Sequence, residues 1–203
     1  MHKKNWLIFD FDGVIVDSFD AAYKLSQHLL KTKDEASYRA LFQGSIADVL
    51  KQKLSPRVIT RFFQQFNRAM LAQPIVPGMA DLITAVSKDY NLAVVSSSTT
   101  GGIKRFLAEF EIEQYFTEIL GYDVAGNKSD KIKDLMNTYH FSNKECIMIT
   151  DTVGDVREAA IVSVPSIAVS WGYENEHDFK SIKTHKVVHT PLELQQAIDS
   201  YFL

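Results

Sequence analysis

Residues 7–18 of the chain read Leu7-Ile8-Phe9-Asp10-Phe11-Asp12-Gly13-Val14-Ile15-Val16-Asp17-Ser18. An apolar run that ends in a glycine turn predicts a strand buried on both faces, as in a parallel sheet. Aspartate is disfavoured inside such a strand, and the two ionised carboxylates repel each other unless a cation or a proton lies between them. A divalent metal with oxygen ligands is the simplest remedy. The plainer alternative is that one aspartate caps the next element and the other is solvated.

The composition is that of an ordinary soluble protein with one sizeable core. The 203 residues are 46% hydrophobic and carry a formal net charge of -3, and the basic residues are scattered, so no nucleic-acid partner is expected. No apolar run approaches the roughly 20 residues that span a bilayer, and no signal peptide is recognised. We therefore expect a cytoplasmic protein with no membrane partner. Cys146 is the single cysteine and is expected to pack inside a strand.

The segment after the first strand has the spacing of helices. Apolar residues recur at helical intervals up to the turn-rich stretch Pro74–Gly78, and no strand is expected before it, which predicts a helical insertion over residues 18–75. Phe62, Phe63 and Phe66 follow this spacing and are interpreted as the core of the insertion rather than as a base-stacking platform.

From residue 79 onward the pattern alternates between helices and short apolar strands. The expected helices span residues 80–88, 102–110, 129–139, 154–161 and 191–202, and the expected strands span 92–95, 117–120, 146–150, 166–169 and 186–189. Such alternation predicts an α/β fold with a parallel sheet covered on both faces. The sequence thus predicts a Rossmann-like three-layer core formed by residues 1–17 and 76–203, interrupted by the small α-helical domain over 18–75.

Polar residues stand where the expected strands end, and in a parallel sheet these ends meet at one edge. The hydroxyl-rich run 96–100 follows one strand and suits an anion such as phosphate, although an ordinary cap and loop would explain it as well. Asp151 and Asp155 follow another strand. Helix capping accounts poorly for four aspartates at two strand ends.

One lysine is expected beside these carboxylates. Lys128 immediately precedes an expected helix for which Ser129 is the expected cap residue. The alternative is an ordinary solvated loop lysine, because Lys131 and Lys133 are nearby rivals for the same place.

The order of these groups resembles the haloacid dehalogenase superfamily across essentially the whole chain. The residues that resemble its four motifs are 10–18, 94–96, Lys128 and 150–155. Two further stretches, Pro77-Gly78 and Ser170-Trp171-Gly172-Tyr173, together with the insertion after the first motif, are similar to the phosphoglycolate phosphatase-like branch, in which the insertion is a small helical cap.

The resemblance implies a Mg²⁺-dependent phosphatase that acts on a small phosphorylated metabolite. Asp10 would attack phosphorus to give an aspartyl-phosphate, and Asp12 would be the general acid and base. Ser96, the backbone at Ser97, and Lys128 would hold the transferring phosphoryl group. The implied metal ligands are Asp10, the backbone carbonyl of Asp12, Asp151 and Asp155, and the implied substrate contacts are Gly13, Ser97, Gly44 and Ser45.

Substrate selection is expected to reside in the cap. The segment Tyr38–Ser45 resembles the part of the cap whose glycine turn faces the substrate, with Arg39, Gln43 and Ser45 as candidate contacts. The alternative is that Gly44 ends one helix and Ser45 begins the next.

Three residues depart from the superfamily pattern. Thr150 stands where glycine or, in mutase-like members, glutamate is usual, Ser129 stands where proline is common, and Ser163 replaces a common glycine. Two alternatives to a phosphatase therefore stay open. One is a phosphomutase of the β-phosphoglucomutase type, which Thr150 disfavours. The other is a non-hydrolytic phospho-ligand-binding or regulatory protein, which would not need the general acid Asp12.

Overall fold

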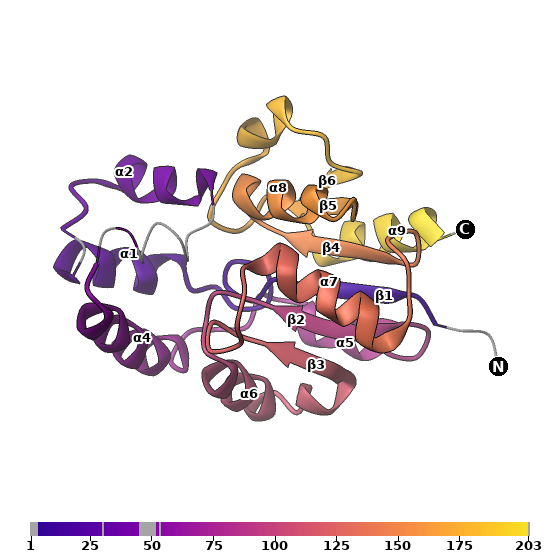
Figure 1. Ribbon diagram of the computed structural model, residues 1–203, viewed down its shortest axis with the longest axis horizontal. Helices are drawn as coiled ribbons and strands as arrows, with labels where there is room; N and C mark the ends of the chain where they lie inside the picture. The colour runs from indigo at the N-terminus through magenta and orange to yellow at the C-terminus, as the bar shows by residue number, and fades with distance from the viewer. Residues whose placement is uncertain (1–3, 30, 45–51, 53, 203) are drawn as a thin grey trace.

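A parallel sheet of six strands forms the centre of the molecule. The computed structural model describes residues 4–29, 31–44, 52 and 54–202 (Figure 1). Its sheet has the order β3-β2-β1-β4-β5-β6, with every neighbouring pair parallel. The strands are β1 (Trp6–Phe9), β2 (Asn91–Val95), β3 (Phe116–Leu120), β4 (Cys146–Thr150), β5 (Ser166–Val169) and β6 (Lys186–Val188). This is the strand order of a Rossmann-like sheet, so the predicted α/β core is confirmed.

Helices cover both faces of the sheet, which explains why the central strands β1 and β4 are buried along their whole length. Leu7 and Phe9 of β1 pack on one side, and Trp6 and Ile8 pack on the other. The first side is covered by α5 (Met79–Val86), α6 (Thr100–Glu109) and α9 (Pro191–Phe202), and the second by α7 (Lys128–Tyr139) and α8 (Val153–Ile161). Short 3₁₀ helices, η2 (Glu113–Tyr115) and η3 (Glu176–Ser181), lie in the connections.

The helices between β1 and α5 lie beyond the carboxyl ends of the strands (Figure 1). Those that the structure describes are α1 (Phe19–Leu29), α2 (Glu35–Arg39), the 3₁₀ helix η1 (Ala40–Gln43) and α4 (Pro56–Met70). The buried residues of α4 include Phe62, Phe63 and Phe66, as its spacing predicts. The start of β1 and the end of α9 lie at the opposite end of the sheet from these helices (Figure 1).

The start of α7 differs from the prediction. Asn127, and not Ser129, is the N-cap residue, since its side chain accepts a hydrogen bond from the Asp130 N–H while the Asp130 carboxylate accepts one from the Asn127 N–H. This reciprocal pair is a capping box. The prediction for Ser129 was wrong because its hydroxyl instead donates to the Asn127 side chain at 2.7 Å. Lys128 is consequently the first residue of α7.

Two further observations concern the cysteine and the length of the helices. Cys146 is buried in β4, as predicted. Across the described ranges of the chain, no helix is long and apolar enough to cross a membrane.

Candidate active site

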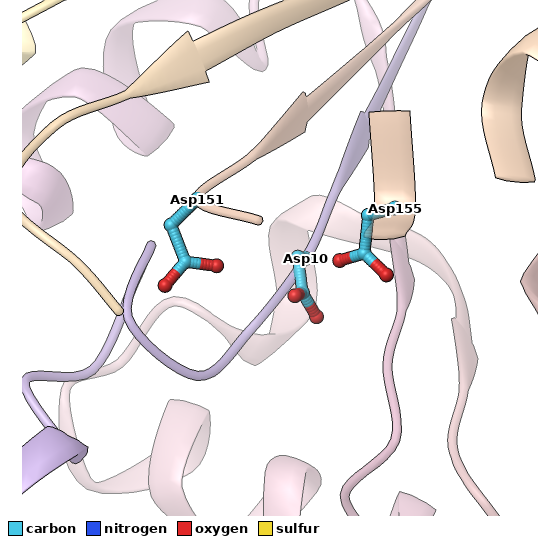
Figure 2. A group of neighbouring side chains, drawn as sticks. All are labelled: Asp10, Asp151 and Asp155. Atoms are coloured by element: carbon cyan, nitrogen blue, oxygen red, sulfur yellow. The ribbon is translucent and has the colours of Figure 1, made fainter. Parts of the chain in front are cut away.

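Three carboxylates meet at the carboxyl edge of the sheet. Asp10 follows β1 and Asp151 follows β4, and these two strands pair directly in the sheet. Asp155 lies in the first turn of α8, where the Thr152 hydroxyl caps the helix. Each aspartate is buried, and one oxygen of each lies within 4.8 Å of the others (Figure 2). The aspartates therefore do not serve as the cap of α8, and the sheet brings them together as a group.

Lys128 is the lysine of this group. Its Nζ lies 2.8 Å from Asp10 Oδ2 and 2.5 Å from Asp155 Oδ2. The rival Lys131, one turn further along α7, donates instead to the backbone carbonyl of Gly121 at 2.7 Å. The first position of α7 thus directs Lys128 toward the carboxylates.

Burial makes this group of charges costly. It raises the pKa of Asp10 well above its usual value and that of Asp151 to about 8, and the attraction of Lys128 only partly offsets this. Burial opposes ionisation of Asp155 as well, but the pair with Lys128 and hydrogen bonds such as that from Thr150 (2.8 Å) bring its pKa below the usual value. One lysine is therefore too little positive charge for three carboxylates.

The residues fit a divalent cation. Asp151 Oδ2 accepts a hydrogen bond from the Tyr173 N–H at 2.7 Å, whereas Asp151 Oδ1 is buried with no hydrogen-bond partner among the described residues. A buried carboxylate oxygen without a partner is rare unless an ion or water binds it. The donor set of Asp10, Asp151 and Asp155 consists of hard oxygen ligands, which suit Mg²⁺.

Two glycines leave the space that the Asp151 carboxylate occupies. Gly13 has a positive φ of 73°, and a Cβ at either Gly13 or Gly172 would overlap Asp151 Oδ2. Gly13 thus lies against a carboxylate of the site.

Asp12 has a different environment from the other three. Its Oδ1 accepts a hydrogen bond from the Ser18 hydroxyl at 2.9 Å, and its Oδ2 accepts one from the Ser98 hydroxyl at 2.5 Å. Burial raises its pKa, and these two hydrogen bonds oppose the rise. Asp12 can therefore hold a proton more readily than a solvated aspartate.

The sequence pattern did not indicate the roles of Ser18 and Ser98. Both belong to stretches that it singled out, but the serine run after β2 offers three adjacent hydroxyls, and sequence does not say which one faces Asp12. The Ser96 hydroxyl instead accepts a hydrogen bond from the Ser98 N–H at 3.0 Å, within the loop.

A pocket joins this group to the helices beyond the sheet. Of the predicted site residues that the structure describes, all except Gly13, Arg39 and Gln43 line it; Ser45 lies outside the described residues. We call Asp10, Asp12, Asp151, Asp155 and Lys128 the carboxylate floor. Facing it is an aromatic wall, defined as Tyr38, Phe42, Phe62, Phe63 and Phe66. The three α4 phenylalanines thus belong to a core, as predicted, and also line the pocket, which their spacing did not indicate.

The wall is attached to the sheet domain through η1. The Gln43 side chain donates to the buried carboxylate of Glu174, which also accepts the Val153 N–H of α8. Arg157 of α8 donates to the Gln43 carbonyl. The candidate contact Arg39 points elsewhere, since it pairs with Glu35 at 2.8 Å and lies 4.0 Å over the Phe19 ring.

Comparisons with known proteins agree with this arrangement. The haloacid dehalogenase-like hydrolase family matches residues 7–169. A phosphoglycolate phosphatase of Synechococcus elongatus is 26% identical over 203 residues, which cover 95% of this chain and 96% of that protein. The tyrosine-protein kinase PtkA of Mycobacterium tuberculosis is 30% identical over 95% of this chain and 72% of its own length.

Solved structures share the fold. A predicted phosphatase from Clostridium acetobutylicum superposes with a TM-score of 0.80 at 22% identity, over 97% of this chain and 99% of that one. The family match covers most of the chain and includes both strands that carry the carboxylate floor. The chain therefore belongs to the haloacid dehalogenase-like hydrolase family.

Proposed function

We propose that this hydrolase is a Mg²⁺-dependent phosphatase that cleaves a small phosphomonoester through an aspartyl-phosphate on Asp10. The observation that carries the proposal is the carboxylate floor, in which Lys128 bridges Asp10 and Asp155 while the buried Asp151 Oδ1 has no partner among the described residues. The names of the two relatives reported above, a phosphatase and a kinase, both describe phosphoryl chemistry.

In the first step a carboxylate oxygen of Asp10 bonds to phosphorus as the bond from phosphorus to the leaving oxygen breaks. Asp12 gives its proton to that oxygen, and burial supports this role because it raises the pKa of Asp12 and so favours the protonated form. Lys128 and the Ser96–Ser97 loop stabilise the charge of the transferring group. The alcohol leaves, and the phosphoryl group stays on Asp10.

In the second step water attacks phosphorus. Asp12, now ionised, accepts a proton from the water, and the bond from phosphorus to Asp10 breaks. Inorganic phosphate leaves, and the Asp10 carboxylate is restored. The Ser18 and Ser98 hydroxyls hold the Asp12 carboxylate in one orientation through both steps.

Asp10, Asp151 and Asp155, with the backbone carbonyl of Asp12, would hold the Mg²⁺ ion. Bound there, the ion would neutralise negative charge on the carboxylates and on the phosphoryl group. Such a charge would also favour the ionised form of Asp10 that the first step needs, against the burial that raises its pKa.

We propose further that residues 18–75 form a cap over the site. The support is the position of α1, α2 and α4 beyond the strand ends (Figure 1), with the aromatic wall lining the same pocket as the carboxylate floor. A cap of this kind excludes water and contacts the leaving group.

The test is hydrolysis of p-nitrophenyl phosphate with and without Mg²⁺, comparing the parent protein with Asp10→Asn and Asp12→Asn. We expect Mg²⁺-dependent phosphate release that falls by about 10⁴-fold or more in Asp10→Asn. Asp134→Asn, at an exposed position of α7, is the matched control and should keep full activity.

The alternatives predict other results. A parent protein that binds Mg²⁺ and phosphate but releases none would contradict the phosphatase proposal and favour a phosphomutase or a binding protein. Activity that survives in Asp10→Asn would contradict the aspartyl-phosphate.

A further inference from the structure

We propose that the pocket selects phosphomonoesters whose leaving group is small, apolar and uncharged, and that it disfavours a leaving group with a carboxylate, such as phosphoglycolate. This inference rests on the proposed phosphatase function and deepens it, because it names the substrate class. It also departs from the substrate in the name of the Synechococcus elongatus relative.

The leaving group must extend from the carboxylate floor toward the aromatic wall. In phosphoryl transfer the attacking and leaving oxygens lie roughly in line with phosphorus. With Asp10 as the nucleophile, the leaving oxygen is on the far side of phosphorus from the strand ends. The pocket on that far side is lined by Tyr38, Phe42 and the α4 phenylalanines.

The wall is aromatic and carries no charged side chain, and its rings pack against one another. The Phe62 and Phe66 rings stack with centroids 5.8 Å apart, and the Phe42 ring packs edge-on against Tyr38 at 5.1 Å and against Tyr173 at 4.8 Å. The Tyr173 hydroxyl lies 3.1 Å from the Ser18 hydroxyl, which itself donates to Asp12. These contacts leave little freedom for a ring to turn away and admit a polar partner.

The pocket has no spare positive charge among the residues that the structure describes. Lys128 is the only cation of the described pocket lining, and it already bridges Asp10 and Asp155. Among the described residues of the lining, a leaving-group carboxylate would therefore meet aromatic rings and no free counter-charge, which is strongly unfavourable. An alkyl or benzyl group in the same place would bury apolar surface, which is favourable.

The first experiment compares kcat/KM for isobutyl phosphate and 2-phosphoglycolate in the presence of Mg²⁺. The two leaving groups have the same number of non-hydrogen atoms and nearly the same shape, and they differ in charge. We expect isobutyl phosphate, and also benzyl phosphate, to exceed 2-phosphoglycolate by at least tenfold. Equal or higher kcat/KM for 2-phosphoglycolate would overturn the inference.

Binding to Asp10→Asn, measured by calorimetry with Mg²⁺ present, separates this inference from the proposed function. We expect isobutyl phosphate to bind at least tenfold more tightly than 2-phosphoglycolate. If the variant shows this binding preference but the parent protein hydrolyses neither ester, the phosphatase proposal is overturned and the selectivity of the pocket is supported. If the parent hydrolyses p-nitrophenyl phosphate, and 2-phosphoglycolate is preferred both in kcat/KM of the parent and in binding to the variant, the phosphatase proposal is supported and the inferred selectivity is overturned.

A positive charge placed on the wall should weaken the preference for an uncharged leaving group. Phe42→Lys puts an ammonium group on the pocket lining and should raise the ratio of kcat/KM for 2-phosphoglycolate over isobutyl phosphate by about tenfold or more. Leu41→Lys, the neighbouring position of η1 outside the pocket lining, is the control and should change the ratio by less than twofold. A similar change in both variants would show that the wall does not set the preference.

Discussion

The carboxylate floor and the aromatic wall face the same pocket but are built in different ways. The floor depends on individual charges, because Lys128 Nζ bridges two carboxylates and each hydroxyl of Ser18, Ser98 and Thr150 serves one aspartate oxygen. The wall depends on ring packing, in which each residue has several apolar neighbours. A buried charge that loses its partner is costly, whereas an apolar surface tolerates substitution by groups of similar size. We therefore expect the floor to determine whether the chemistry occurs and the wall to determine on which substrate.

The largest effect should come from the floor, in a comparison of two buried lysines on one helix. Lys128→Met should lower kcat for p-nitrophenyl phosphate by about 10³-fold, because the charge beside Asp10 is lost. Lys131→Met removes an equally buried lysine whose Nζ bonds the Gly121 carbonyl, and we expect near-normal kcat. Activity is measured per folded protein, with folding checked by circular dichroism. Equal losses in both variants would contradict the assignment of Lys128.

A single hydroxyl of the floor gives the next test. Thr150→Val removes the hydrogen bond to Asp155 Oδ2, which should raise the pKa of Asp155 and lower activity by about tenfold. Because the carboxylate then gains its proton at higher pH, the acidic limb of the pH–rate profile should move to higher pH. Thr150→Ser keeps the hydroxyl and should keep the parent profile. An unchanged profile in Thr150→Val would mean that Asp155 does not need this donor.

A smaller effect on activity should come from the contact between η1 and α8, which attaches the aromatic wall to the sheet domain. A Cβ at Gly154 would lie 2.6 Å from the Phe42 carbonyl oxygen, so Gly154→Ala should push η1 away from α8 and raise KM several-fold with little change in kcat. Gly101→Ala is the control, because a Cβ there meets no atom within 4 Å and alanine favours a helix by about 0.5–1 kcal/mol. Steady-state kinetics measures KM and kcat of both variants. A rise in KM in Gly154→Ala alone indicates that η1 has moved, whereas the same rise in Gly101→Ala would indicate a general effect of alanine.

The smallest effect on turnover should come from Glu174, whose carboxylate joins the Gln43 side chain of η1 to the Val153 N–H of α8. Burial raises its pKa to about 7 from an ordinary value near 4.5. A pKa that is higher in the folded state contributes stability that is fully present below pH 4.5 and is lost as pH rises through 7. We expect the free energy of unfolding of the parent to fall across this range relative to Glu174→Gln, with kcat within about twofold. Parallel pH dependence in urea titrations of the two proteins would contradict this.

Much of the fold was predictable because the strands are short, apolar and bounded by turns. The expected strand 146–150 coincides with β4 (Cys146–Thr150), and the expected helix 191–202 coincides with α9 (Pro191–Phe202). The helix starts were less accurate, since α6 begins at Thr100 and α7 at Lys128. Capping depends on which of several adjacent polar side chains bonds the free N–H groups, and composition alone does not decide this.

The sequence by itself determined the α/β class, the meeting of Asp10 and Asp12 with Asp151 and Asp155, and the family that this order of groups resembles. It could do so because hydrophobic periodicity fixes the strands, and parallel strands bring their carboxyl ends to one edge. Only the tertiary structure decided between Lys128 and Lys131, assigned Ser18 and Ser98 to Asp12, and turned the α4 phenylalanines toward the carboxylates. These depend on the direction of side chains and on contacts between residues far apart in the chain, which the spacing of residue types does not record.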